Sequence, residues 1–296
     1  MASNGFMCLV SQRGRSYSFI RSIFVDRDPH DKTQFVPVGS IITLTTDFGL
    51  QDAFVGTMKG VILGIAPDAR LVDLTHDVPP FDVRAGAYAL YAAYRYFPAE
   101  TIHLAVVDPG VGSARRAVAV RTSWGTFVAP DNGLLSLVLS RESVRQAVAL
   151  ENPAYRLPHV SHTFHGRDVF APAAAHIARG VPLAEFGPTA SDLVTFPASR
   201  PTRQDDALVG HVIYVDRFGN LVTDVTETDL PGSVVAVEAG GQRMAGLSAA
   251  YADVSPGQPL ALIGSAGHLE IGVRGGHAAC VLGLVVGDQV IITVQT

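Results

Sequence analysis

The chain has 296 residues, of which 48% are hydrophobic and 17% are charged, and its formal net charge is -5. This length can hold two domains with separate cores, and the lack of a basic excess argues against a nucleic-acid partner. The apolar runs are short and are interrupted by Gly, Pro or charged residues, which argues against a membrane-spanning segment.

Residues 1–39 differ in composition from the rest of the chain. Up to Val25 they contain Arg13, Arg15 and Arg21, several serines and no acidic residue, as targeting segments do. The apolar patch around Arg21 is short, however, and no small-residue cleavage site follows it. We therefore expect a poorly ordered extension.

Strand and helix patterns alternate over residues 40–190. In chain order they predict a strand at Ser40–Thr46, a helix at Ala53–Ile65, a strand at Arg70–Leu74, a helix at Val83–Tyr96, strands at Thr101–Val107, Ala117–Thr122 and Thr126–Ala129, and helices at Gly133–Leu139 and Phe170–Arg179. This alternation predicts an α/β domain with a largely parallel sheet. In such sheets, ligands bind beyond the carboxyl ends of the strands.

The pattern changes after a polar, proline-bearing stretch at residues 191–209, which we interpret as a linker. The strands predicted beyond it are Val209–Val215, Ser233–Glu238, Leu260–Ile263, Leu269–Val273 and Val290–Val294, with glycine-rich turns between them. No long helical pattern interrupts this region. Residues 210–296 are therefore expected to form a smaller all-β domain, either a barrel or a sandwich.

The two cysteines, Cys8 and Cys280, are too few and too far apart for a disulfide framework or a structural zinc site. We expect free thiols in a cytoplasmic protein. His159 and His162 are three residues apart, but no third ligand is evident nearby. We therefore predict neither a metal nor another cofactor.

Asp47 directly follows the first predicted strand. A carboxylate at a strand end can accept two hydrogen bonds from a ribose diol. It can equally cap the next helix or stabilise a turn. Its spacing alone favours the structural interpretation.

Asp108 and Arg115 enclose a loop that contains Gly110 and Gly112. Glycines allow a tight backbone and a close approach of a ligand, and an adjacent arginine stabilises a carboxylate charge. The pair could belong to a reactive site or be a salt bridge that braces the loop. The two interpretations have equal weight on this pattern alone.

His165 lies among Thr, Gly, Arg and Asp in a short loop before a predicted helix. Histidine handles protons near neutral pH, although a lone histidine is more often packed or exposed without a catalytic role. Its polar surroundings favour the catalytic interpretation modestly. Asp168 could contribute to the same loop or cap the helix near Phe170.

Two turns in the all-β region carry polar groups. The stretch from Asp216 to Asn220 offers a carboxylate, an aromatic ring and an amide, and the stretch from Gly264 to Gly267 offers a hydroxyl and backbone N–H groups. Both could bind a ligand. Both could also be ordinary strand connections.

Each of these motifs is ambiguous alone, but their order along the chain is specific. The series is Thr45-Thr46-Asp47-Phe48-Gly49, Asp73-Leu74-Thr75-His76, Asp108-Pro109-Gly110-Val111-Gly112, Pro130-Asp131-Asn132-Gly133, Thr163-Phe164-His165-Gly166-Arg167-Asp168, Asp216-Arg217-Phe218-Gly219-Asn220 and Gly264-Ser265-Ala266-Gly267. Over residues 40–296 it resembles the S-adenosyl-L-methionine hydroxide adenosyltransferases, which are relatives of the fluorinases and chlorinases.

The resemblance implies hydrolysis of S-adenosyl-L-methionine to adenosine and L-methionine, with water or hydroxide attacking ribose C5′. It implies a catalytic set of Asp108, Arg115 and His165. It also implies binding roles for Asp47 at the ribose hydroxyls, Asp216 at the methionine ammonium, Asn220 at the adenine, Ser265 at the methionine carboxylate and Phe218 in the adenosine pocket. Phe48, Thr163 and Phe164 belong to the same motifs and are further binding candidates. The family implies a homotrimer with sites between the α/β domain of one subunit and the all-β, substrate-binding domain of the next.

One departure and two alternatives accompany this interpretation. The halogenases carry an arginine after the serine that corresponds to Ser265, and this chain has Ala266 there. A halogenase is the nearest alternative, but halogenases have tyrosine and then serine or glycine where this chain has His165 and Gly166. A non-catalytic protein that binds S-adenosylmethionine or a nucleoside is the other, and it would not need the three catalytic candidates together.

Overall fold

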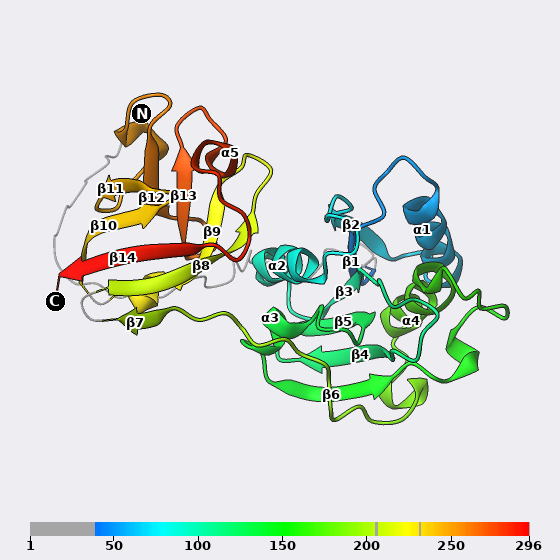
Figure 1. Ribbon diagram of the computed structural model, residues 1–296. Helices are drawn as coiled ribbons and strands as arrows, with labels where there is room; N and C mark the ends of the chain where they lie inside the picture. The colour runs from blue at the N-terminus through cyan, green and yellow to red at the C-terminus, as the bar shows by residue number, and fades with distance from the viewer. Residues whose placement is uncertain (1–38, 205–206, 231, 296) are drawn as a thin grey trace, which may run out of the picture. The chain divides into compact units, whose positions relative to one another are not determined.

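The computed structural model describes residues 39–204, 207–230 and 232–295 (Figure 1). The predicted poorly ordered extension, residues 1–39, lies outside the described residues except for its last position. Within the described ranges, no helix is both long and apolar enough to cross a membrane.

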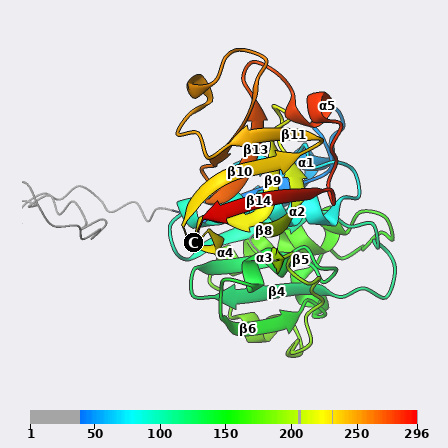
Figure 2. The ribbon, with the colours of Figure 1, turned by 60° about the vertical axis from the view of Figure 1, so that its left-hand side comes forward.

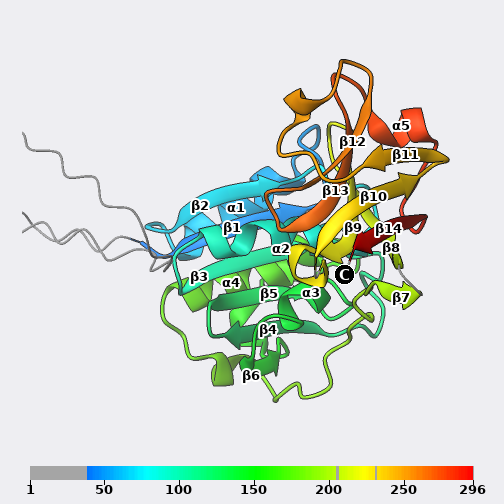
Figure 3. The ribbon, with the colours of Figure 1, turned by 90° about the vertical axis from the view of Figure 1, so that its left-hand side faces the viewer.

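A six-stranded sheet forms the first part of the described chain. Its strands are β1 (Ile41–Thr46), β2 (Arg70–Thr75), β3 (Thr101–Val106), β4 (Ala117–Thr122), β5 (Gly125–Pro130) and β6 (Val144–Ala149). Their order is β2-β1-β3-β5-β4-β6, and only β4 runs opposite in direction to the other five strands. Figure 2 shows β5, β4 and β6 one above the other, and Figure 3 shows all six strands in this order. The predicted α/β domain with a largely parallel sheet is confirmed.

Helices cover both faces of this sheet (Figure 1). On one face lie α1 (Phe54–Ile65) and α4 (Ala171–Ala178), and on the other lie α2 (Val83–Ala93) and α3 (Ser136–Leu139). Met58 and Ile62 of α1 are buried in the core of the first face, because a spacing of four residues keeps them on one side of a helix. Asp82 caps α2 by accepting the backbone N–H of Ala85 at 2.9 Å.

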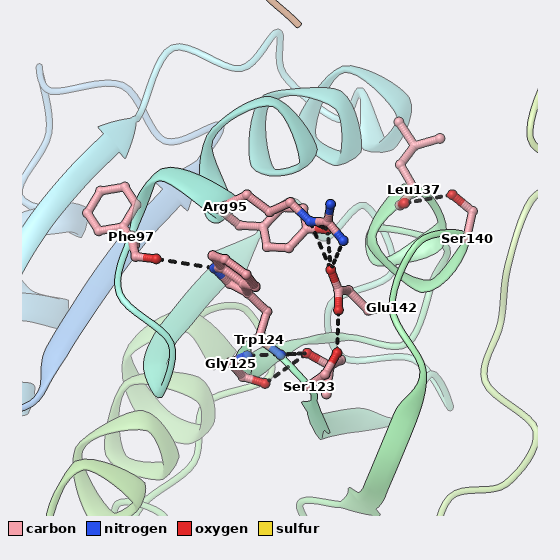
Figure 4. Close-up of polar contacts among 10 residues, drawn as sticks. Arg95, Phe97, Ser123, Trp124, Gly125, Leu137, Ser140 and Glu142 are labelled. Atoms are coloured by element: carbon pink, nitrogen blue, oxygen red, sulfur yellow. Dashed lines mark hydrogen bonds and ion pairs between the residues drawn. The ribbon is translucent and has the colours of Figure 1, made fainter. Parts of the chain in front are cut away.

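A buried carboxylate joins the end of α2 to the turn between β4 and β5 (Figure 4). Glu142 Oε1 accepts hydrogen bonds from Tyr94 Oη at 2.8 Å and from Arg95 Nη2 at 2.7 Å. Its Oε2 accepts one from Ser123 Oγ at 2.6 Å. Burial alone would raise the pKa of Glu142, but these hydrogen bonds, that of Ser123 first, lower it below its ordinary value.

The second part of the described chain is an antiparallel sheet. Its strands are β7 (Thr202–Gln204), β8 (Ala207–Val215), β9 (Leu221–Thr226), β10 (Ser233–Ala239), β11 (Gln242–Ala245), β12 (Pro259–Ile263), β13 (His268–Val273) and β14 (Gln289–Gln295). The order is β11-β10-β14-β8-β9-β13-β12, with β7 beside β8. Ser248 N–H donates to the Ala261 carbonyl at 2.7 Å, joining the chain after β11 to β12 at the opposite edge. The sheet is therefore nearly a barrel, which confirms the predicted all-β fold.

Several elements differ from the sequence prediction. The strands β6, β7, β9 and β11 and the helix α5 (Ala278–Leu282) were not predicted. The remaining short helices are η1 (Tyr94–Tyr96), η2 (Pro153–Tyr155), η3 (Gly166–Phe170), η4 (Leu183–Phe186), η5 (Glu227–Asp229) and η6 (Tyr251–Asp253). The predicted helix Phe170–Arg179 corresponds to α4, and the π-helical turn η3 directly precedes it. The boundaries 40–190, 191–209 and 210–296 stay a prediction.

Candidate active site

Asp108, Arg115 and His165 form one continuous contact network. Arg115 Nε lies 2.8 Å from Asp108 Oδ1 and 2.9 Å from Oδ2, and its Nη2 also donates to Oδ2. The same Nη2 lies 2.8 Å from His165 Nδ1. The side chains of Asp108 and Arg115 are only 5% and 10% exposed, so solvent screens this ion pair weakly. The structure thus brings together the three predicted catalytic residues.

Two loops place these side chains. Asp108 follows β3, Arg115 precedes β4, and His165 precedes η3. Gly112 has a φ of +79°, and a Cβ at this position would lie 2.5 Å from the carbonyl oxygen of His162. A side chain there would push the two loops apart. Glycine therefore permits the approach that lets Arg115 reach His165.

The contact between Arg115 and His165 fixes the protonation state of the imidazole. A guanidinium has only donors, so Nδ1 must accept and the proton of the neutral ring lies on Nε2. Burial lowers the pKa of His165, and the positive charge of Arg115 lowers it further, while Asp108 acts in the opposite direction. Neutral His165 can therefore donate its Nε2–H to another group.

Asp168 fixes the loop that carries His165. Its Oδ2 accepts the backbone N–H of Ser161 at 2.9 Å, and its Oδ1 accepts from Arg167 Nε at 2.6 Å. The side chain is fully buried. The first of the two sequence interpretations is therefore correct: Asp168 stabilises the loop, and its carboxylate accepts no capping hydrogen bond from α4.

Asp47 lies after β1, and its Oδ2 accepts the backbone N–H of Phe81 at 2.9 Å. Burial raises the pKa of Asp47, and the nearby charge of Asp108 adds to this rise, while the hydrogen bond from Phe81 opposes it. The second carboxylate oxygen has no such partner among the described contacts. Asp47 and the catalytic network therefore lie within electrostatic reach of each other.

Aromatic rings pack between Asp47 and the His165 loop. Phe48 contacts Phe54 and Phe164 with ring centroids 5.9 and 5.8 Å apart, and Phe54 lies 5.1 Å from Phe164. These edge and tilted arrangements are favourable for aromatic pairs. Thr163, the residue before Phe164, is exposed. Phe48 and Phe164 therefore form an apolar wall beside the predicted ribose contact.

The predicted binding residues of the all-β region lie on two turns. Asp216 Oδ1 accepts the backbone N–H groups of Phe218 and Asn220 at 2.9 and 2.8 Å, and its Oδ2 accepts from Asn220 Nδ2 at 2.9 Å. Phe218 is 76% exposed and Ser265 is also exposed. Asp216 and Asn220 thus bind each other, whereas the Phe218 ring and the Ser265 hydroxyl are accessible.

Four of the predicted site residues line two separate cavities. Arg115 and His165 line one of about 450 Å³. Asp216 and Ser265 line another of about 180 Å³, together with Glu270. Within the described chain, then, the two groups of candidates do not share a cavity. Among the described residues, no three His, Cys, Asp or Glu side chains gather as they would around a metal ion.

The family models match both regions of the chain. The model described as SAM hydroxide adenosyltransferase N-terminal domain matches residues 42–187, and the one described as SAM hydroxide adenosyltransferase C-terminal domain matches residues 210–291. The chain belongs to the SAM hydroxide adenosyltransferase family. The suspected resemblance is confirmed.

Individual members and relatives of this family agree with the match. The chain is 43% identical over 258 residues to a Salinispora tropica protein named (R)-S-adenosyl-L-methionine hydrolase, covering 85% of this chain and 97% of that protein. A fluorinase of Actinoplanes sp. is 32% identical over 217 residues, or 64% of this chain and 73% of that protein. A crystal structure of an uncharacterized conserved protein from Thermotoga maritima has a TM-score of 0.79 and 38% identity, covering 86% of this chain and 99% of that one.

Two residues near the candidate site residues were not among the sequence candidates. Phe81 is 72% exposed, has a φ of +68° and donates its N–H to Asp47; the sequence signal was an aromatic residue after two prolines. Glu270 lines the cavity of Asp216 and Ser265. Its signal was an acid within the otherwise apolar stretch Leu269–Val273 of β13.

Proposed function

We propose that this chain hydrolyses S-adenosyl-L-methionine to adenosine and L-methionine by attack of a water oxygen on ribose C5′. The observation that carries the proposal is the contact network of Asp108, Arg115 and His165 in a member of the SAM hydroxide adenosyltransferase family. A protein that only binds S-adenosylmethionine would have no need of this buried network.

The chemistry requires activation of the nucleophile more than of the leaving group. Methionine leaves a sulfonium carbon as a neutral thioether, so no general acid and no cofactor are needed. Water is a poor nucleophile at neutral pH, and donors that stabilise a developing hydroxide lower the barrier. The guanidinium of Arg115 and the Nε2–H of His165 are such donors.

Asp108 is the anionic acceptor of this network. Each carboxylate oxygen has more lone pairs than its bonds to Arg115 use, whereas Nδ1 of His165 faces Arg115. We assign Asp108 to orienting Arg115 and to receiving the proton of the attacking water. In-line placement of that water and the ribose carbon supplies the remaining acceleration.

Substrate binding divides between the two regions. We assign Asp47 to the ribose hydroxyls, with Phe48, Thr163 and Phe164 at the walls of the nucleoside pocket. In the all-β region we assign Asp216 to the methionine ammonium, Asn220 to the adenine, Phe218 to the adenosine pocket and Ser265 to the methionine carboxylate. The bonds between Asp216 and Asn220 pre-orient this second set.

We further propose a homotrimer in which each site combines the α/β region of one subunit with the all-β region of its neighbour. This arrangement, implied by the family resemblance, is supported by the separation within one chain of the cavity that Arg115 and His165 line from the cavity that Asp216 and Ser265 line. We also assign the protein to the cytoplasm, on the argument from its two dispersed cysteines.

Isotope labelling tests the reaction. With S-adenosylmethionine in ¹⁸O-labelled water, mass spectrometry should find label in the 5′-hydroxyl of adenosine. Molar chloride or fluoride should yield no 5′-halogenated nucleoside, because Asp108 places a negative charge beside the nucleophile. Adenine with a labelled ribosyl product would mean glycosidic cleavage and would overturn the proposal, as would unchanged substrate.

A further inference from the structure

The cavity of Asp216 and Ser265 carries negative charge without a matching cation. It is lined by two carboxylates, Asp216 and Glu270, and no arginine or lysine of the described chain lines it. His268 also lines it, but burial lowers the pKa of this ring, and the hydrogen bond between its Nδ1 and the carbonyl oxygen of Thr223, at 2.8 Å, opposes this shift only in part. A cationic ligand group would compensate this charge.

Glu270 lies against the turn that we assign to the methionine carboxylate. Its Oε2 would lie 2.6 Å from a Cβ placed on Gly264, the first residue of that turn. Its Oε1 accepts a hydrogen bond from the Tyr251 hydroxyl. Burial raises the pKa of Glu270, and the negative charge of Asp216 raises it further. The hydrogen bond from Tyr251 lowers the same pKa in part. A second carboxylate on this turn would meet like charge.

We propose that this cavity recognises the ammonium group of the substrate more strongly than its carboxylate, so that the enzyme also hydrolyses adenosyl sulfonium compounds with an aminopropyl group and no carboxylate. Decarboxylated S-adenosylmethionine is the simplest example. The inference rests on the proposed function, because the proposed function assigns Asp216 and Ser265 to the amino-acid end of the substrate. Two acids then face one ammonium, while Ala266 provides no cation for a carboxylate.

The reaction keeps the same balance with this substrate. The water oxygen forms a bond to ribose C5′, and the bond from C5′ to sulfur breaks with its electron pair remaining on sulfur. Adenosine and 3-methylthiopropylamine are the products, and one proton passes to solvent. No oxidant, reductant or further reactant is required.

The experiment compares kcat/KM for S-adenosylmethionine and its decarboxylated analogue. We expect the wild-type protein to use the analogue at least as efficiently. Glu270→Gln keeps an acceptor for Tyr251 but removes the charge, and it should lower the preference for the analogue about tenfold. Ala266→Arg should lower it further, because a guanidinium pairs with the substrate carboxylate. Glu238→Gln, an exposed change on β10, should leave the preference unaltered.

The outcomes separate this inference from the proposed function. The inference alone would be overturned if the protein hydrolysed S-adenosylmethionine but its kcat/KM for the decarboxylated analogue were less than about 1% of that for S-adenosylmethionine. An unchanged preference in a Glu270→Gln protein with wild-type melting temperature would do the same. Failure to hydrolyse either compound would overturn the proposed function itself.

Discussion

Arg115 touches both other members of the catalytic network, and neither it nor His165 is assigned to the ribose. Arg115→Ala and His165→Ala should therefore lower kcat by about 10²–10⁴ while the affinity for S-adenosylmethionine changes only a few fold. Single-turnover kinetics gives the rate of chemistry, and calorimetry gives the affinity. Loss of binding in either variant would show that these residues hold substrate instead.

Asp47 should behave in the opposite way. The proposed contact with the ribose diol would exist before and during the reaction, so Asp47→Ala should remove uniform binding. Loss of hydrogen bonds to a charged group should weaken affinity about 10- to 100-fold. Asp52→Ala, an exposed change nearby, is the matched control. A large fall in kcat at saturating substrate would place Asp47 in the chemical step.

The protonation state of His165 gives the enzyme a pH dependence. Arg115 can donate a hydrogen bond to Nδ1 only while His165 is neutral. Protonation of Nδ1 therefore removes this contact and leaves a charged ring in place of the neutral Nε2–H donor. Since the pKa of His165 is lowered from 6.5, activity should persist below pH 6.5 and fall at more acidic pH. A kcat/KM profile measures the midpoint. In His165→Gln this acid limb should disappear, and its persistence there would assign the limb to another group.

At the scale of residues, the order of the motifs predicted which side chains would meet, but not how they meet. The pattern around Asp108, Arg115 and His165 indicated that these residues form one catalytic set. Which nitrogen of His165 accepts from Arg115, however, depends on how the loop between β3 and β4 lies against the loop before η3. Phe81 was missed because its positive φ arises from the path of the loop before α2. No periodic pattern encodes that path.

At the scale of elements, the buried Glu142 fixes the junction of α2 and the β4–β5 turn. Glu142→Ala removes three partners and leaves the Tyr94 and Ser123 hydroxyls without an acceptor, which should reduce the free energy of unfolding by about 2–3 kcal/mol. Urea unfolding measures the change. Glu238→Ala, which breaks an exposed pair with Arg243, should cost less than about 1 kcal/mol.

The pKa of Glu142 adds a test by pH. Because this pKa is lowered from 4.5 in the folded protein, its charge contributes stability above pH 4.5 and loses that contribution as pH falls through the lower folded-state pKa. The difference in stability between wild type and Glu142→Gln should therefore shrink on acidification below pH 4.5. A difference independent of pH would mean that shape, not charge, matters at this position.

Segments with strong apolar spacing were predictable as elements, and several segments without it were not. The α1 helix and the central strands have strong apolar spacing, which their burial confirms. In contrast, β9 follows the Asp216–Asn220 turn directly and was obscured by the motif, and α5 has only five residues. The π-helical turn η3 arises from the fixed His165 loop, which helix propensity alone does not encode.

At the scale of the whole molecule, the separation of the site candidates into two cavities predicts how activity should depend on assembly. If each site combines two subunits, an intact site needs the α/β residues of one chain and the all-β residues of another. A subunit with a defect in one half can then still contribute its other half. Light scattering at assay concentration should accordingly find a trimer, and an active monomer would contradict the shared-site proposal.

Mixed oligomers test the sharing of sites directly. His165→Ala and Asp216→Ala should each be nearly inactive alone, because one lacks a catalytic residue and the other lacks the assigned ammonium contact. After the two are unfolded together in equal amounts and refolded, each site has a one-in-two chance of an intact α/β half and a one-in-two chance of an intact all-β half. About a quarter of wild-type activity should therefore return if each site joins two chains. Mixing without subunit exchange is the control and should restore nothing. If the co-refolded sample also stays inactive, while each variant alone refolds to the same oligomer, each site must lie within one chain.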